Sequence, residues 1–253
     1  MTSTSETGHA KNVANFQDLI SFVTAYGPTY NPAQQAIKLN ELNILHTNAK
    51  NALNTVHTKL AVFIDEINKR QLAFEPLNKL TTRLIAALDA SGPTQKIVAD
   101  ARTFARKITG ARKSKKILTP NPDDPKSISA SQQSYDMRLE NFRKLIELLK
   151  IEPLYNPNET DLKIASLNSL ASDLELKNTH LTNANTDLSN ARIARNNILY
   201  TQNTGLYDIQ FEVKKYVKSV FGASSPQYNQ IKSIIFTMPS KIKKFLQFLH
   251  SLS

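Results

Sequence analysis

A set of residues occurs twice in this 253-residue chain at an almost constant separation. The pairs Asn15-Phe16 and Leu19-Ile20 recur, identical, 126 positions later, and the triplet Tyr30-Asn31-Pro32 recurs 125 positions later. The separation of 125 also relates two sets of apolar residues spaced by seven, which are Leu42, Ala49, Val56 and Phe63 and their counterparts Leu167, Leu174, Leu181 and Leu188. These matches predict an internal duplication in which both halves of the chain fold alike.

The spacing of apolar residues predicts that each repeat is helical. In the first repeat they step by three or four positions, as one face of a helix requires, and His46 fills the one gap. Six glycines and eleven prolines are few for a fold rich in strands and turns. The sequence Asn-Pro, found at Asn31-Pro32 and Asn156-Pro157, is typical of helix starts. The Asn side chain accepts a hydrogen bond from a free main-chain N–H, and Pro has no N–H that would need a partner. Each pair is therefore expected to begin the long helix of its repeat.

The predicted fold class is all-α, with two tandem, internally duplicated bundles of about four helices, each built on one long coiled-coil-like helix. We expect helices at about 13–26, 32–70, 74–90 and 94–110 in the first repeat, and at 136–150, 158–202, 205–221 and 226–237 in the second. The predicted domains are a disordered N-terminus at 1–12, one bundle at 13–111, a basic Pro- and Ser-rich linker at 112–135, a second bundle at 136–237, and a basic amphipathic helix at 238–253.

The leucines spaced by seven in the second repeat also resemble a leucine zipper. The alternate seam positions hold Ala171, Asn178 and Asn185, however, and no basic region precedes the first leucine. A DNA-binding zipper needs that basic region. The pattern therefore favours the core of a bundle.

The net charge of +11 is concentrated in two segments. Residues 102–122 and 213–253 hold seven cations each and no acid, around the fourth predicted helix of each repeat and beyond it. Arrays of Lys and Arg bind phosphate backbones without a base-reading motif. The candidate polyanion-binding residues are Arg102, Arg106, Lys107, Arg112, Lys113, Lys115, Lys116, Lys214, Lys215, Lys218, Lys241, Lys243 and Lys244.

No pattern for catalysis or for a cofactor stands out in the sequence. The chain has no cysteine, its five histidines are not spaced as metal ligands, and no Glu-x-x-His occurs. Ser240 and Lys243 form a Ser-x-x-Lys, but the companion motifs of that enzyme class are missing. We therefore expect no enzyme activity, no cofactor, no metal and no small-molecule substrate.

The function predicted from the sequence is that of a non-enzymatic structural or protein-interaction protein, with a protein partner or self-association. The alternative is binding of nucleic acid or another polyanion, without sequence preference, through the two basic segments. The helix at 238–253 also suits a membrane surface or a partner groove. Residues 1–17 lack a signal-peptide core, and no apolar run reaches the ~18 residues of a membrane span, so a cytoplasmic location is expected.

Overall fold

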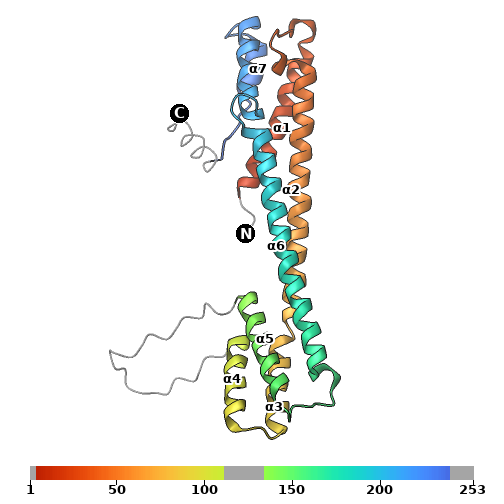
Figure 1. Cartoon of the computed structure of the whole chain (residues 1–253). Helices are drawn as coiled ribbons and strands as arrows, with labels where there is room; N and C mark the ends of the chain where they lie inside the picture. Colours follow the sequence, from red (N-terminus) through yellow and green to blue (C-terminus); the bar gives the residue numbers. More distant parts are fainter. Residues whose placement is uncertain (1–3, 111–133, 240–253) are drawn as a thin grey trace, which may run out of the picture. The chain divides into compact units, whose positions relative to one another are not determined.

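The computed structural model describes residues 4–110 and 134–239, with side chains from residue 8 onward (Figure 1). Over these residues the regular structure consists of helices, and none of them forms a strand. The all-α class predicted from the apolar spacing is therefore confirmed. The basic linker and the C-terminal helix fall almost wholly outside the described residues. At their edges, Ser134 and Tyr135 open a helix, and Met238 and Pro239 close the described chain.

The helices group into two compact units that are not the two halves of the sequence. Unit 1 consists of Met1–Ala61 and Thr186–Ser253, and unit 2 of Val62–Asn185. This grouping differs from the consecutive bundles expected at 13–111 and 136–237. Two long helices, α2 (Leu39–Phe74) and α6 (Ile164–Tyr200), contribute residues to both units.

The length of the long helices explains this grouping. They have 36 and 37 residues, which corresponds to about 55 Å at 1.5 Å per residue, whereas α3, α4 and α5 have only 14 to 17 residues. One set of short helices therefore covers only part of the apolar seam of a long helix. The rest of the seam needs a second set, and α3, α4 and α5 accordingly lie in unit 2, whereas α1, α7 and α8 lie in unit 1.

Unit 1 contains α1 (Thr4–Ala25), α7 (Leu206–Phe221) and α8 (Pro226–Lys232), together with the first part of α2 and the last part of α6. Two 3-10 turns, η1 (Gly27–Thr29) and η2 (Gln35–Ile37), connect α1 to α2. Apolar side chains from all five helices form one core. Its most deeply buried members include Phe16, Leu19, Leu42, Leu199, Val213 and Ile231.

Unit 2 contains α3 (Leu77–Ala90), α4 (Gln95–Thr109) and α5 (Tyr135–Ile151), with the end of α2 and the start of α6. Helix α4 packs against both α3 and α5 (Figure 1). The turn η4 (Thr160–Leu162) leads into α6. The core of this unit includes Phe74, Leu84, Ile108, Phe142, Leu145 and Leu167.

Both long helices begin later than the Asn-Pro pairs predicted. Helix α2 starts at Leu39 and α6 at Ile164, each directly after its 3-10 turn. The hydroxyl of Tyr30 donates to the carbonyl of Ile37 at 2.7 Å, and the hydroxyl of Tyr155, 125 positions on, donates to that of Leu162 at 2.8 Å. Ile37 and Leu162 are buried as well, so tertiary contacts hold each turn in place of an extra turn of helix.

The disorder expected for residues 1–12 is not found from Thr4 onward, because α1 begins there instead of near residue 13. His9 and Asn12 are 2% and 1% exposed. The ring nitrogen Nδ1 of His9 lies 2.7 Å from the hydroxyl of Tyr200, and the Asn12 side-chain amide donates to the same hydroxyl. A polar sequence is ordered here because its side chains have buried hydrogen-bond partners.

The predicted seam is continuous in α6 and interrupted in α2. Residues of α6 are buried at steps of three or four from Leu167 to Leu199, including Leu181. In α2 the burial holds as far as Val56, but Phe63 is only half-buried. The prediction that Phe63 is a core residue is therefore wrong. Helix α8 also ends earlier than expected, at Lys232 instead of residue 237.

Candidate functional site

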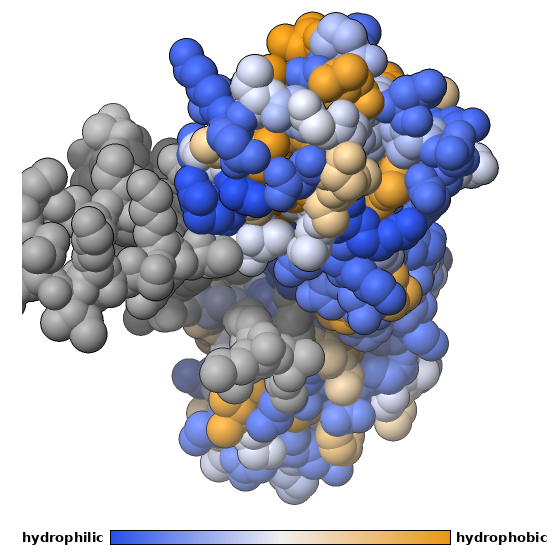
Figure 2. Space-filling view, turned by 90° about the horizontal axis from the view of Figure 1, so that it is seen from below, coloured by the Kyte–Doolittle hydropathy of each residue, from blue (hydrophilic) through white to orange (hydrophobic). Residues whose placement is uncertain are grey.

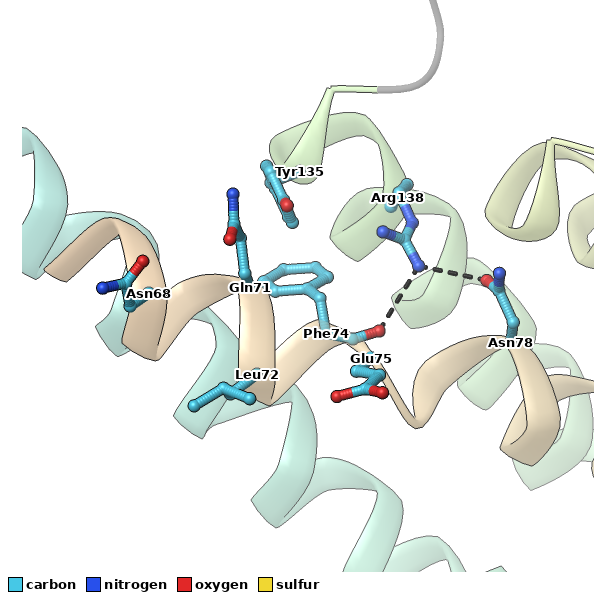
Figure 3. Close-up of a pocket in the computed structure, with 8 residues that line it drawn as sticks. All are labelled: Asn68, Gln71, Leu72, Phe74, Glu75, Asn78, Tyr135 and Arg138. Atoms are coloured by element: carbon cyan, nitrogen blue, oxygen red, sulfur yellow. Dashed lines mark hydrogen bonds between the residues drawn. The ribbon is translucent and has the colours of Figure 1, made fainter. Parts of the chain in front are cut away.

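A hollow lies in unit 2, where the end of α2 meets the start of α5 (Figure 3). Its volume is about 740 Å³. Eight side chains from α2, α3, α5 and the α2–α3 turn line it, and these are Asn68, Gln71, Leu72, Phe74, Glu75, Asn78, Tyr135 and Arg138. Arg138 is the one cation of this lining, and its contacts decide what the hollow offers to a ligand.

Arg138 uses its N–H groups within the protein. Its Nε donates to the carbonyl of Ile108 at 3.1 Å, and its Nη2 donates to the Asn78 side chain at 3.0 Å and to the carbonyl of Phe74 at 3.4 Å. Ile108 and Phe74 lie in the last turns of α4 and α2, where carbonyls lack helical partners and a cation is favoured. Burial lowers the pKa of Arg138. The guanidinium therefore links α5 to three other helices, α2, α3 and α4.

Aromatic rings complete this linkage. The rings of Phe74 and Tyr135 meet edge to face with centroids 4.8 Å apart, and the guanidinium carbon of Arg70 lies 4.1 Å from the Tyr135 centroid. Such cation–ring contacts stabilise packing. The lining contains one carboxylate, that of Glu75, and no histidine, so it does not supply a paired acid and base. The contacts indicate a structural role for this cluster.

The residues 126 positions away occupy a related cluster in unit 1. Tyr135, Arg138 and Phe74 correspond to His9, Asn12 and Tyr200. The rings of His9 and Tyr200 have centroids 5.5 Å apart, and Asn12 donates to Tyr200 at 3.2 Å. Sequence reasoning missed both clusters, because neither buried polar residues nor helix-end contacts leave a signal in apolar spacing. The separation of 126 was the one clue available.

A second hollow, of about 480 Å³, lies along α4 and α5 and is lined mainly by apolar atoms. We call it the α4–α5 groove, and its residues are Phe104, Glu140, Arg143, Lys144, Glu147, Leu148 and Ile151. Ile151 is 77% exposed. On the face shown in Figure 2, hydrophobic side chains form small groups separated by hydrophilic ones.

Several described members of the predicted polyanion site have partners within the protein. Arg102 pairs with Asp89 at 2.9 Å and Lys215 with Glu212 at 2.7 Å. Lys214 is half-buried, its Nζ donates to the carbonyl of Ile234 at 2.6 Å, and burial lowers its pKa. Arg106 donates to Thr103. Lys107 and Lys218 lie in the last turns of α4 and α7, and the remaining candidates, Arg112, Lys113, Lys115, Lys116, Lys241, Lys243 and Lys244, lie outside the described residues.

The described residues of the two basic segments lie on different kinds of helix. Arg102, Arg106 and Lys107 belong to α4, whereas Lys214, Lys215 and Lys218 belong to α7, which corresponds by sequence to α3. Helix α8, the actual fourth helix of the second repeat, carries only Lys232.

Within residues 4–110 and 134–239, no three His, Asp or Glu side chains gather in a way that could hold a metal ion. The helices of this part of the chain are too polar or too short to cross a membrane. The fold thus defines the class as an all-helical protein over its described residues. In comparisons with known proteins, the chain matches no protein-family model, and neither a curated protein nor a solved structure is significantly similar to it.

Proposed function

We propose that this chain is a non-enzymatic structural protein that associates with a second copy of itself. The observation that carries the proposal is the α4–α5 groove. Large apolar side chains that stay in contact with water over a connected area are typical of association surfaces. Here Phe104 and Leu148 are half-buried, and Ile151, which lines the same groove, is 77% exposed.

The charges around the groove favour a second copy as the occupant. Its rim holds two acids, Glu140 and Glu147, and two bases, Arg143 and Lys144. Lys144 pairs with Glu140 at 3.1 Å, and Arg143 pairs with Glu175 at 2.6 Å. The rim is therefore locally neutral in a chain whose net charge is +11. Two identical faces repel each other least where their local charge is zero.

We also propose that the scaffold arose by internal duplication. The support is a set of paired features at the separations found in the sequence. Leu42 and Leu167 are both fully buried, and the two tyrosine-to-carbonyl bonds that precede α2 and α6 are equivalent. In this proposal each compact unit joins the first part of one repeat to the last part of the other.

The association is tested with the variant Ile151→Glu, measured by sedimentation equilibrium at about 1–100 µM chain. We expect the wild-type chain to form dimers over this range and the variant to remain monomeric, since a carboxylate buried in the contact would lose its hydration. Leu176→Glu is the matched control. Leu176 is 48% exposed on α6 and does not line the groove, so this variant should associate like the wild type.

Two results would refute the proposal. One is a wild-type chain that stays monomeric at the highest concentration. The other is a dimer that Ile151→Glu and Leu176→Glu weaken equally, because the contact would then not involve the groove.

A further inference from the structure

In unit 1 the chain that follows α8 runs in extended form past α1 and α7. We call residues 234–238 the strap. Its side chains alternate, as in a strand: Ile234, Phe236 and Met238 pack against the core, whereas Ile235 is 69% exposed and Thr237 is exposed. An extended segment with apolar residues at every second position thus covers this face of unit 1.

Polar side chains hold the strap by its main chain. The Thr237 amide donates to Oδ1 of Asn12 at 2.9 Å, and Nδ2 of Asn12 donates to the Thr237 carbonyl at 2.7 Å. Asn15 Nδ2 donates to the carbonyl of Ile235 at 2.6 Å, and Lys214 Nζ donates to that of Ile234 at 2.6 Å. These four bonds would form with any extended peptide, because each of them involves only a main-chain atom of the strap.

The groove under the strap is built to be occupied. Asn12 is 1% exposed, and its amide also donates to Tyr200, whose hydroxyl contacts His9. If the strap left without a replacement, Asn12 would lose its two main-chain partners and the apolar residues under the strap would be exposed to water, which is costly. Exchange of the strap for another extended segment preserves these bonds. The groove therefore favours replacement over opening.

Unit 2 closes the corresponding place differently. There α4 continues as a helix to Thr109, and Arg138, the counterpart of Asn12, binds the carbonyl of Ile108 near its end. In unit 1 the helix stops at Lys232 and the strap takes over. The side chains that hold an extended main chain are thus a particular feature of unit 1.

We propose that the groove between α1 and α7 binds an extended segment of a partner protein with apolar side chains at three alternate positions, and that the strap is its resident occupant. Main-chain bonds with pockets for alternate side chains are a general way to bind extended peptides. The three apolar strap residues are only half-buried, so a segment that buries more apolar area on the same surface can displace them. The site shares no residue with the α4–α5 groove and goes beyond the proposed self-association.

The test measures the binding of a fluorescent peptide, which corresponds to residues 232–239, to the full chain by fluorescence anisotropy. The resident strap competes at high effective concentration, so the wild type should bind the peptide weakly. The double variant Ile234→Ser with Phe236→Ser loosens the strap, and we expect it to bind the peptide at least tenfold more tightly. Adding Asn12→Leu should remove that gain. A peptide of the same composition with its apolar residues consecutive should bind at least tenfold more weakly.

The proposal is overturned if the double variant, with its helical circular dichroism intact, binds the peptide no better than the wild type, or if Asn12→Leu leaves the gain in place. A second measurement needs no variant: excess unlabelled peptide should speed hydrogen exchange of the wild-type strap, and unchanged exchange would also refute the idea. The dimer itself gives a further test. If Phe236→Ser abolishes a wild-type dimer and Ile151→Glu preserves it, the groove binds the strap of a second copy, and the proposal of a separate partner protein is ruled out.

Discussion

Tyr30 and Tyr155 each use one hydroxyl to close a turn before a long helix. Both hydroxyls are buried together with their acceptor carbonyls, those of Ile37 and Leu162. Burial is the main cause that raises the pKa of Tyr30, and it raises that of Tyr155 to about 12. Both groups are thus neutral donors at neutral pH. The two tyrosines hold equivalent turns by the same bond.

Removing either hydroxyl should have a similar effect. Tyr30→Phe and Tyr155→Phe each leave a buried carbonyl without its donor, which costs about 1–3 kcal/mol of unfolding free energy. Urea denaturation followed by circular dichroism would measure it. Tyr228→Phe is the control, since Tyr228 is half-buried and no bond from its hydroxyl is seen in the described part of unit 1. A loss at only one of the two turns would contradict their equivalence.

Helix ends show where local sequence signals and tertiary packing disagree. The Asn-Pro pairs are good local start signals, yet α2 and α6 begin seven to eight residues after them.

The turn between α6 and α7 shows the opposite case, a local constraint that packing cannot relax. A Cβ added to Gly205 would lie 2.7 Å from the main-chain nitrogen and oxygen of Thr201. Real Cβ atoms do not approach main-chain atoms this closely, so this position requires glycine.

Gly205→Ala should therefore destabilise the protein. The main chain of Tyr200 and Thr201, at and just after the end of α6, would have to shift, and overpacking of this kind costs about 1–3 kcal/mol. Gly8→Ala is the matched control, because its added Cβ would meet only Thr237 Oγ1 at an ordinary 3.7 Å and Ala favours a helix. Thermal melts should show a lower Tm for Gly205→Ala and an equal or higher Tm for Gly8→Ala. An equal Tm for the wild type and both variants would mean that the α6–α7 turn adjusts freely.

The composition of the units leads to a prediction for the whole chain. Residues 118–125 can be replaced by a protease recognition sequence, and the purified chain can then be cut there. Each unit contains helices from both sides of the cut, so the fragments should stay together at the mass of the uncut assembly. Gel filtration followed by denaturing electrophoresis of the peak would show both fragments. Two consecutive bundles would instead separate into two peaks.

The helical class and the repeated apolar pattern follow from the sequence alone, because helix periodicity is a property of neighbours three and four positions apart. The bounds of α3, α5 and α7 were predicted to within a few residues for the same reason. The sequence did not predict that residues 8–12 are ordered, because their ordering depends on hydrogen bonds to the hydroxyl of Tyr200, about 190 positions further along the chain.

Only the tertiary structure decided which helices pack together and which polar groups are buried. Apolar spacing shows that a long helix has a seam, but not whether the helices of its own repeat cover all of it. The described basic residues illustrate the same limit: a charge count cannot tell that Lys214 binds a strap carbonyl while Arg102 pairs with Asp89. Local patterns determine secondary structure here, whereas partner choice depends on contacts between residues far apart in the chain.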